Sequence, residues 1–307
     1  MYYFIVNEHG GSGQAVKTWE KVKAVLDKKN VQYKYFVPEL KGYAAVLAEQ
    51  ISEITDDDDI RLVVVGGDGT INEVLNGIRN FDRIKFGVIP TGSGNDFSRG
   101  LGLPLKKPEK VTEMILNSPG TRKIDLGLTE SAGRKRIFGI SSGYGMDAIV
   151  GTGINTSKIK VIMNKLHLNS LSYAVLTVIT LFSMKTYKFK VSVDDGPLME
   201  FDKAIFLAAM NFPCEGGGVP MAPKATAQDG KLSFCIAYGI PKWRTFFAFP
   251  VLLAAKHEKI KGFKVLDGKK LDVYSDIPTI SATDGELFGN LTEVHFKCLE
   301  NKLTILL

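Results

Sequence analysis

A short apolar strand that runs into a glycine-rich turn is the feature that most constrains this chain. Residues 62–65 read Leu-Val-Val-Val, which is typical of a strand covered on both faces. Residues 66–69 read Gly-Gly-Asp-Gly, and such glycines permit positive φ and close approach by a ligand. Thr70 and Glu73 fit a capping box, which predicts a helix beginning at Thr70. The free amides and dipole of that helix end suit an anion.

Asp68 is unexpected in a turn that only cradles phosphate. A carboxylate repels phosphate unless it holds a cation or takes a proton. We therefore expect phosphoryl transfer with Mg²⁺, in which Asp68 acts on the metal, on the acceptor hydroxyl or on both. The structural alternative is a tight turn in which Asp68 caps backbone amides.

A second strand, at residues 86–90, also ends in a polar turn. Residues 91–97 read Thr-Gly-Ser-Gly-Asn-Asp-Phe and again combine glycines, hydroxyls and a carboxylate. Two such turns about 25 residues apart fit neighbouring strand ends of a doubly wound sheet, where ligands bind. Taken alone, this second stretch also fits an ordinary polar loop.

Together the two turns resemble the lipid kinase family that includes soluble bacterial diacylglycerol kinases, sphingosine kinases and ceramide kinases. The glycine-rich Asp motif alone also resembles NAD kinases and 6-phosphofructokinases, whereas the turn at 91–97 favours the lipid kinases. The resemblance extends over nearly the whole chain. It implies ATP as phosphoryl donor, Mg²⁺ as cofactor and a lipid alcohol as acceptor, with diacylglycerol favoured.

The order of elements predicts two domains. Alternating strands and helices through residue 97 indicate a parallel sheet, and short alternating segments after residue 123 indicate an antiparallel β domain. We expect an N-terminal doubly wound α/β nucleotide domain at residues 1–125 and a C-terminal antiparallel β-sandwich domain at residues 126–297. The resemblance implies that residues 298–307 return to the first domain.

Three turns supply the predicted nucleotide site. The first strand ends at Asn7 and is followed by a glycine-rich loop, in which Glu8 replaces the proline that is usual in the family. A simple strand-to-helix turn is the alternative for this loop. The predicted nucleotide-binding residues are Asn7, Gly10, Gly11, Ser12, Gly66, Gly67, Asp68, Gly69, Thr70, Ile71, Asn72, Thr91, Gly92, Ser93 and Asn95.

The resemblance also assigns catalytic and acceptor-side residues. The segment Asp-Gly-Glu at 284–286 resembles the family segment that carries the proposed proton acceptor, and this role maps onto Glu286. Asp68 is the second predicted catalytic carboxylate. Weaker matches make Asp96, Asp125 and Asp147 candidates for the acceptor side, with a turn cap as the alternative for Asp125.

A structural Mg²⁺ is implied near residue 229. In relatives the matching Asp-Gly turn binds the metal through its carboxylate and flanking main-chain carbonyls. Here these would be Asp229 and the carbonyls of Thr226 and Lys231, an oxygen-only set that suits Mg²⁺. An Asp-Gly hairpin turn without metal is the alternative.

Composition narrows the cellular setting. The net charge of +6 fits a nucleotide or an anionic membrane, and the chain has no Lys/Arg block interleaved with aromatics that would indicate nucleic acid. There is no apolar stretch of about 18 residues and no signal-peptide pattern at the start. The three cysteines are scattered, as in a reduced cytoplasmic protein.

Peripheral membrane association is a further expectation. The apolar segment 246–253 is followed by Lys256, Lys259, Lys261 and Lys264, which suits contact with an anionic membrane surface. A buried helix with a solvated end is the alternative for this segment. The sequence leaves a homodimer open.

Two other functions stay open. An NAD kinase would phosphorylate a ribose hydroxyl of a soluble acceptor. A non-catalytic membrane-associated sensor would bind nucleotide only. The presence of both Asp68 and Glu286 argues against the sensor, because a pure binder needs no base.

Overall fold

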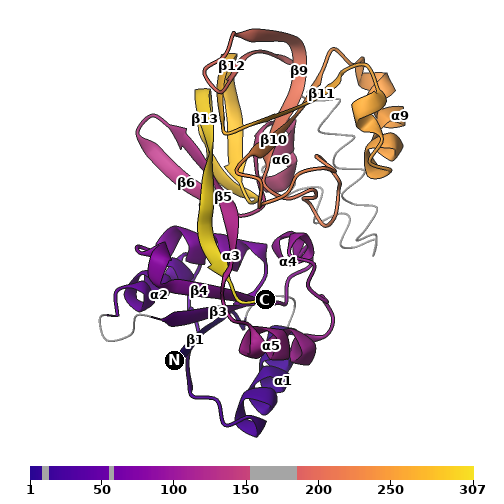
Figure 1. Cartoon of the computed structure of the whole chain (residues 1–307). Helices are drawn as coiled ribbons and strands as arrows, with labels where there is room; N and C mark the ends of the chain where they lie inside the picture. Colours follow the sequence, from indigo (N-terminus) through magenta and orange to yellow (C-terminus); the bar gives the residue numbers. More distant parts are fainter. Residues whose placement is uncertain (9–13, 55–58, 153–184) are drawn as a thin grey trace.

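The structure is a computed structural model in which an α/β domain and a β domain lie end to end (Figure 1). It describes residues 1–8, 14–54, 59–152 and 185–307.

Four parallel strands form the centre of the N-terminal domain, in the order β2-β1-β3-β4. Helices α1 and α5 pack together on one face of this sheet, and α2 and α3 pack together on the other (Figure 1). The predicted doubly wound α/β domain is therefore confirmed. Its elements are β1 (Tyr2–Val6), α1 (Gln14–Lys28), β2 (Tyr33–Phe36), α2 (Tyr43–Ser52), β3 (Ile60–Gly66), α3 (Asp68–Gly77), the 3₁₀ helix η2 (Phe81–Arg83), β4 (Ile84–Pro90), α4 (Asp96–Gly100) and α5 (Pro108–Asn117).

Strands β3 and β4 end at the same edge of the sheet. Both are buried along nearly their whole length, as their unbroken apolar sequences predict. Gly66 of β3 pairs with Pro90 of β4 at the last position of each strand. The two polar turns that follow therefore leave the sheet side by side.

Helix α3 begins at Asp68, with Gly67 as its N-cap residue, two residues before the start that the capping box predicts. That prediction is wrong because Thr70 is used elsewhere. Its side chain is buried, and its Oγ1 accepts a hydrogen bond of 2.8 Å from Asn7 Nδ2. This bond ties the end of β1 to the first turn of α3.

The C-terminal domain is an antiparallel β-sandwich, as predicted. The long strands β9 and β12 each pair with β7 along one part and with β8 along another, so the sheet folds over on itself. Aromatic side chains fill the space enclosed. The elements are β5 (Arg122–Ser131), β6 (Arg134–Phe138), β7 (Ser141–Gly145), α6 (Met146–Thr152), β8 (Tyr187–Val193), β9 (Met199–Met210), β10 (Leu232–Tyr238), α9 (Lys242–Leu253), the 3₁₀ helix η3 (His257–Lys259), β11 (Phe263–Gly268), β12 (Lys270–Thr283) and β13 (Glu286–Ile305).

Strand β13 belongs to both domains. It pairs with β12 and β5 in the sandwich, and its last residues, Thr304 and Ile305, then lie parallel to β4. Leu303, Ile305 and Leu306 are buried in the core of the N-terminal domain. The end of the chain thus completes the first domain's sheet and fixes the sandwich above the glycine turns. None of the described helices is both long and apolar enough to cross a membrane.

The packing of α2 on α3 generates a stability prediction. A Cβ at Gly77 would lie 2.1 Å from the carbonyl oxygen of Ala45, whereas a Cβ at Gly69 of the same helix would meet nothing within 4 Å. We expect Gly77→Ala to lower the free energy of unfolding by about 1–3 kcal/mol through overpacking. Gly69→Ala should raise it slightly, by up to about 1 kcal/mol. Urea denaturation checks both, and equal effects of the two variants would contradict the packing described.

Candidate active site

The two glycine turns touch each other through their backbones. The Thr91 N–H donates to the Gly66 carbonyl at 3.0 Å. A Cβ at Gly67 would lie 3.0 Å from the Cα of Gly92, and a Cβ at Gly92 would lie 2.8 Å from the Cα of Gly67. Any side chain at either position would push the turns apart. The glycines are therefore required by this contact, independently of a ligand.

Asn95 holds the second turn in shape. It adopts a left-handed conformation with φ of 53°, which asparagine tolerates better than most residues. Its side chain accepts from the Gly92 N–H at 2.9 Å and donates to the Gly92 carbonyl at 2.7 Å. The predicted nucleotide residue Ser93 is exposed between them.

Asp68 caps the short helix α4. Its two carboxylate oxygens accept hydrogen bonds from the backbone N–H of Asp96, at 3.1 Å, and of Phe97, at 3.2 Å. Burial raises the pKa of Asp68 to about 6; the two N–H groups oppose this, and the carboxylates of Asp96 and Asp284 add to it. The amide-capping alternative is thus part of the structure. It orients the carboxylate without excluding a catalytic role.

Asp96, a predicted acceptor-side residue, connects the domains. It is buried, and its carboxylate accepts from the Gly217 N–H, in the loop after β9, at 2.6 Å and from Arg99 Nε at 3.3 Å. The aromatic rings of Phe97 and Phe212 meet edge to face at 5.6 Å in the same seam. Helix α4 is therefore a docking point for the second domain.

A cavity of about 520 Å³ opens beside the first glycine turn and the loop after β2. Asn7 and Thr70, joined by their hydrogen bond, form part of its wall. The described residues that line it are Asn7, Pro38, Glu39, Leu40, Lys41, Ala44, Gly67, Gly69, Thr70, Glu73 and Gly92. Five of the predicted nucleotide residues are among them. Gly10, Gly11 and Ser12 lie outside the described residues.

Two predicted nucleotide residues in α3, Ile71 and Asn72, are not among the described residues that line the cavity. Ile71 and Asn72 are buried in α3. Asn72 Nδ2 donates to the Ile137 carbonyl at 3.1 Å and to Asp284 Oδ2 at 2.9 Å, and its Oδ1 accepts from Arg136 Nη2 at 2.7 Å. The side chain of Asn72 thus serves the contact between the domains. A nucleotide contact by either residue stays a prediction.

The turn between β12 and β13 places Glu286 beside the cavity at the glycine turns. The buried carboxylate of Asp284 accepts from Asn72 and from three backbone N–H groups, of Gly139 at 2.8 Å, Ile140 at 2.9 Å and Ser141 at 3.0 Å. Burial raises the pKa of Asp284, and these donors oppose the rise. Sequence reasoning missed this anchor, because an Asp-Gly turn gives no sign of partners so distant along the chain.

Glu286 reaches the wall of the cavity from the second domain. Its Oε2 is 2.8 Å from Nζ of Lys41, which lines the cavity. Sequence reasoning did not select Lys41, because the residues before it, Pro38 and Glu39, depart from the family pattern after this strand. The only signal was its position after a strand end of the parallel sheet.

The other predicted acceptor-side residues, Asp125 and Asp147, are not among the described residues that line the cavity. Asp125 accepts from the Gly230 N–H at 2.8 Å and from the Asn301 N–H at 2.7 Å, so it braces the turn at residue 229 against β13. Asp147, at the start of α6, shares a hydrogen bond with Glu215. Burial raises the pKa of both of these carboxyls, and their proximity raises that of Glu215 further.

The turn at Asp229 offers oxygen donors of the kind that Mg²⁺ prefers, namely one carboxylate and main-chain carbonyls. Asp229 is exposed, and its Oδ1 accepts from the Lys231 N–H at 3.1 Å. No group of three metal-ligating side chains occurs in the part of the chain that the structure describes. A metal held by Asp229 with the carbonyls of Thr226 and Lys231 stays a prediction.

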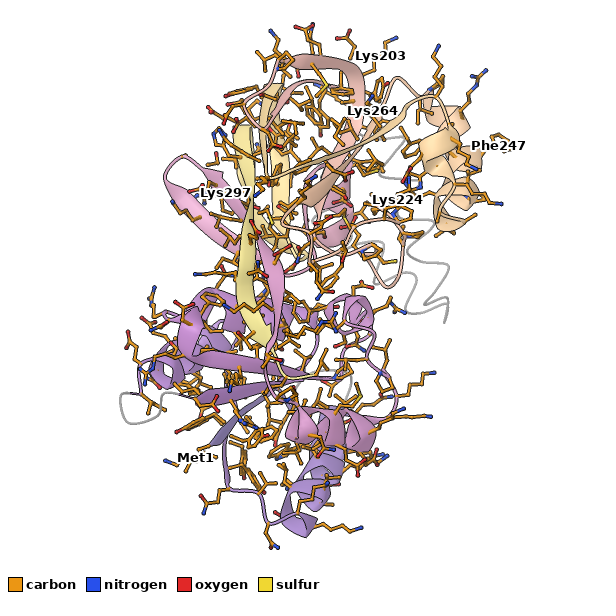
Figure 2. All side chains as sticks on the ribbon, viewed as in Figure 1. Met1, Lys203, Lys224, Phe247, Lys264 and Lys297 are labelled. Carbon is orange, nitrogen blue, oxygen red and sulfur yellow. The ribbon has the colours of Figure 1, made fainter. Side chains whose placement is uncertain are left out.

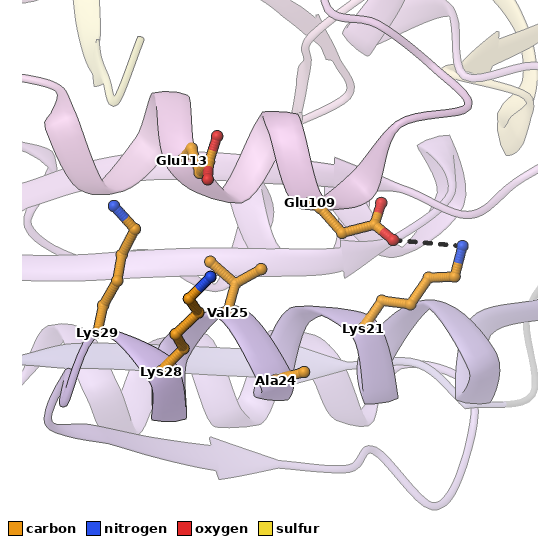
Figure 3. A pocket seen from close by; sticks show the side chains of 7 residues that line it. All are labelled: Lys21, Ala24, Val25, Lys28, Lys29, Glu109 and Glu113. Carbon is orange, nitrogen blue, oxygen red and sulfur yellow. Dashed lines mark ion pairs between the residues drawn. The ribbon is translucent and has the colours of Figure 1, made fainter.

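A second cavity of about 520 Å³ lies between α1 and α5 (Figure 3). Lysines of α1 face glutamates of α5 across it, and Lys21 Nζ lies 3.3 Å from Glu109 Oε1. Its described lining contains no residue of the glycine turns. This groove therefore lies apart from the candidate site.

Comparison with known proteins identifies the family. Residues 1–129 match the diacylglycerol kinase catalytic domain, and residues 141–307 match the YegS C-terminal NAD kinase beta sandwich-like domain. The chain belongs to the diacylglycerol kinase-like family of lipid kinases. The gap between the two matches, residues 130–140, contains the end of β5 and all of β6. It lies close to the point where the α/β domain gives way to the β-sandwich.

Relatives of this lipid kinase match over most of their length. It is 29% identical over 292 residues to the "Putative lipid kinase YtlR" of Bacillus subtilis, covering 94% of each chain. It is 27% identical to a diacylglycerol kinase of Mycobacterium tuberculosis, over 88% of this chain and 83% of the relative. The crystal structure of a "putative diacylglycerol kinase" from Bacillus anthracis has the same fold, with a TM-score of 0.77 at 22% identity over 99% of this chain and 96% of the other.

The environment of Asp68 predicts a pH dependence of stability. Folding raises its pKa from 3.8 to about 6, so the folded state holds this proton more tightly than the unfolded chain. The resulting stabilisation is complete below about pH 3.8 and is lost as the pH rises through about 6; a shift of about two units corresponds to about 3 kcal/mol.

The measurement is the free energy of unfolding between about pH 4 and pH 7 for the wild type and Asp68→Asn. We expect the free energy of unfolding of the wild type, relative to that of the variant, to fall by about 2–3 kcal/mol over this interval. Asp202→Asn, at an exposed side chain, serves as control and should run parallel to the wild type. Parallel curves for Asp68→Asn as well would contradict the burial described.

Proposed function

We propose that this lipid kinase transfers the terminal phosphoryl group of ATP to the hydroxyl group of diacylglycerol. The supporting observation is the position of Glu286. It comes from the second domain, yet its carboxylate contacts Lys41 in the wall of the cavity formed by the nucleotide domain. An acceptor that enters along the second domain would thus meet a nucleotide held by the first.

The division of roles follows from the two domains. The glycine turns and the N-terminal amides of α3 would hold the phosphates. Glu286 would accept the proton of the acceptor hydroxyl, because a carboxylate within hydrogen-bond reach can act as general base. Asp68, fixed by the amides of Asp96 and Phe97, would face the phosphate side. Mg²⁺ bound with the nucleotide would offset the phosphate charge, which leaves positioning and electrostatics to the protein.

Diacylglycerol is favoured by the relatives, and the alternative acceptor is NAD. The description of the second domain as NAD kinase beta sandwich-like gives that alternative its support. The two acceptors differ in where the enzyme meets them. A lipid acceptor must be reached at a membrane, whereas NAD is dissolved in water.

We also propose peripheral binding to an anionic membrane through the end of α9. Figure 2 labels Phe247 on this helix, with a side chain that is 68% exposed. The lysines that follow the helix, Lys256, Lys259 and Lys261, are exposed. Exposed apolar and basic side chains in one segment of the chain suit the headgroup region of such a membrane.

A phosphorylation screen tests the activity. Labelled ATP is offered with diacylglycerol, sphingosine, ceramide, undecaprenol and NAD, with Mg²⁺ and after chelation. We expect Mg²⁺-dependent labelling of diacylglycerol, which Glu286→Gln lowers by about 10²- to 10⁴-fold in kcat and Asp68→Asn abolishes. Glu113→Gln, in the groove between α1 and α5, is the control and should act as wild type. Labelling of NAD alone, or of nothing, would refute the proposal.

Sedimentation with vesicles tests the membrane contact. Anionic vesicles should bind the protein and salt should release it, since charges more than about 10 Å apart are screened at 0.1 M ionic strength. Replacing Lys256, Lys259 and Lys261 by Gln should lower binding by up to about 10²-fold, because each nearby lysine contributes about 1 kcal/mol. Replacing Lys28, Lys29 and Lys110 removes the same charge elsewhere. Equal losses in both triple variants would mean that net charge alone drives binding.

A further inference from the structure

One ion pair joins the second domain to the wall of the candidate nucleotide cavity. Lys41 Nζ and Glu286 Oε2 are 2.8 Å apart, although the residues are separated by 245 positions in the chain. Lys41 lies in the loop between β2 and α2, and Glu286 is the first residue of β13. The contact thus joins a wall of the cavity to the candidate general base.

The two ends of this ion pair differ in how firmly they are held. Glu286 follows the turn whose Asp284 carboxylate accepts four hydrogen bonds. Lys41 is on a loop next to Gly42, which has a φ of 87° and open space around it. The Lys41 side chain is 76% exposed, against 30% for Glu286. The ammonium group is therefore the part that can change partner.

Lys41 is also the cationic side chain of the cavity wall. The other charged residues among the described lining are Glu39 and Glu73, both acidic. A nucleoside triphosphate brings several negative charges into such a cavity, and two carboxylates oppose it. Of the described lining residues, Lys41 alone carries a charge that attracts the phosphates, and its ammonium group has three donors to offer.

We propose that Lys41 exchanges Glu286 for the terminal phosphate of a bound nucleoside triphosphate, and that this exchange frees the base. The inference rests on the proposed function for the role of Glu286. While the ammonium group is bonded to Oε2, it holds the carboxylate against Lys41 and takes one of its acceptor positions. Once the ammonium group binds phosphate, the carboxylate can turn to the acceptor hydroxyl. Donor binding thereby precedes proton abstraction, and Lys41 acts as a positioning residue for Glu286.

An exposed ion pair suits such an exchange. Exposed pairs contribute little to stability, because water and salt screen them and two long side chains lose freedom. Hydrogen bonds between an ammonium group and phosphate are charge-assisted on both sides and are stronger. The exchange is thus favourable, and it costs the fold little.

The test is a double-mutant cycle on nucleotide affinity, measured by calorimetry with the full chain and no lipid. We expect Lys41→Met to weaken ATP binding about tenfold, equivalent to about 1.4 kcal/mol, and ADP binding less than about threefold. Glu286→Gln should tighten ATP binding about two- to fivefold, because it removes the competing partner. In the Lys41→Met background, Glu286→Gln should leave the ATP affinity unchanged, since the two effects are coupled. Lys41→Arg should keep most of the affinity.

The control is Lys135→Met. It removes an ion pair with Glu130 in which the side chains are 67% and 30% exposed, nearly the same as for Lys41 and Glu286. It should leave both affinities unchanged. The proposal is overturned if Lys41→Met binds ATP like the wild type, if ATP and ADP weaken equally, or if Glu286→Gln acts the same in both backgrounds. Failure of the lipid screen with an intact cycle would refute the proposed acceptor instead, because the cycle contains no lipid.

Discussion

The carboxylate of Asp284 holds the turn that carries Glu286 and ties this turn to the first domain. Removing a charged group from water is expensive unless hydrogen bonds replace its hydration. Here four donors do so, three from the backbone of residues 139–141 and one from Asn72. Hydrogen bonds to charged groups contribute about 1.5–3 kcal/mol each. Three of these bonds hold the turn within the second domain, and the fourth, from Asn72, ties it to the first domain and so favours one relative placement of the two.

Other contacts between the two domains also hold them in one relative placement. Asp96 receives a hydrogen bond from Gly217 of the second domain, and the rings of Phe97 and Phe212 meet edge to face. Strand β13 adds continuous backbone pairing from the sandwich to β4. These contacts are buried or in regular sheet, so neither solvent nor salt weakens them much. The seam is therefore the rigid part of the site, against which a nucleotide and an acceptor can be aligned.

The contact between the domains at the cavity is exposed and weak instead. The ion pair between Lys41 and Glu286 is largely exposed, and such pairs contribute about 0.2–1 kcal/mol. A single hydrogen bond to Asp284 outweighs it. Stability thus resides where the domains meet, and the contacts that a ligand must displace are weak ones. This distribution suits an enzyme whose catalytic groups come from two domains and whose substrates enter between them.

The sequence by itself determined the parallel sheet, the sandwich and the meeting of the two glycine turns. These follow from local signals: apolar runs of strand length, glycines at strand ends, and the rule that parallel strands present their carboxyl ends at one edge. The start of α3 was misjudged because Thr70 satisfies the capping pattern locally, while Asn7 takes its hydroxyl in the folded protein.

Only the tertiary structure decided which polar residues face the cavity and which hold the domains together. Asn72 and Asp68 are neighbours in one motif, yet Asn72 turns to Asp284, while Asp68 caps α4. Lys41 and Asp284 carry no motif of their own. Their roles come from partners more than a hundred residues away, and a hydrogen bond across that distance depends on how the domains pack rather than on any local pattern of residues.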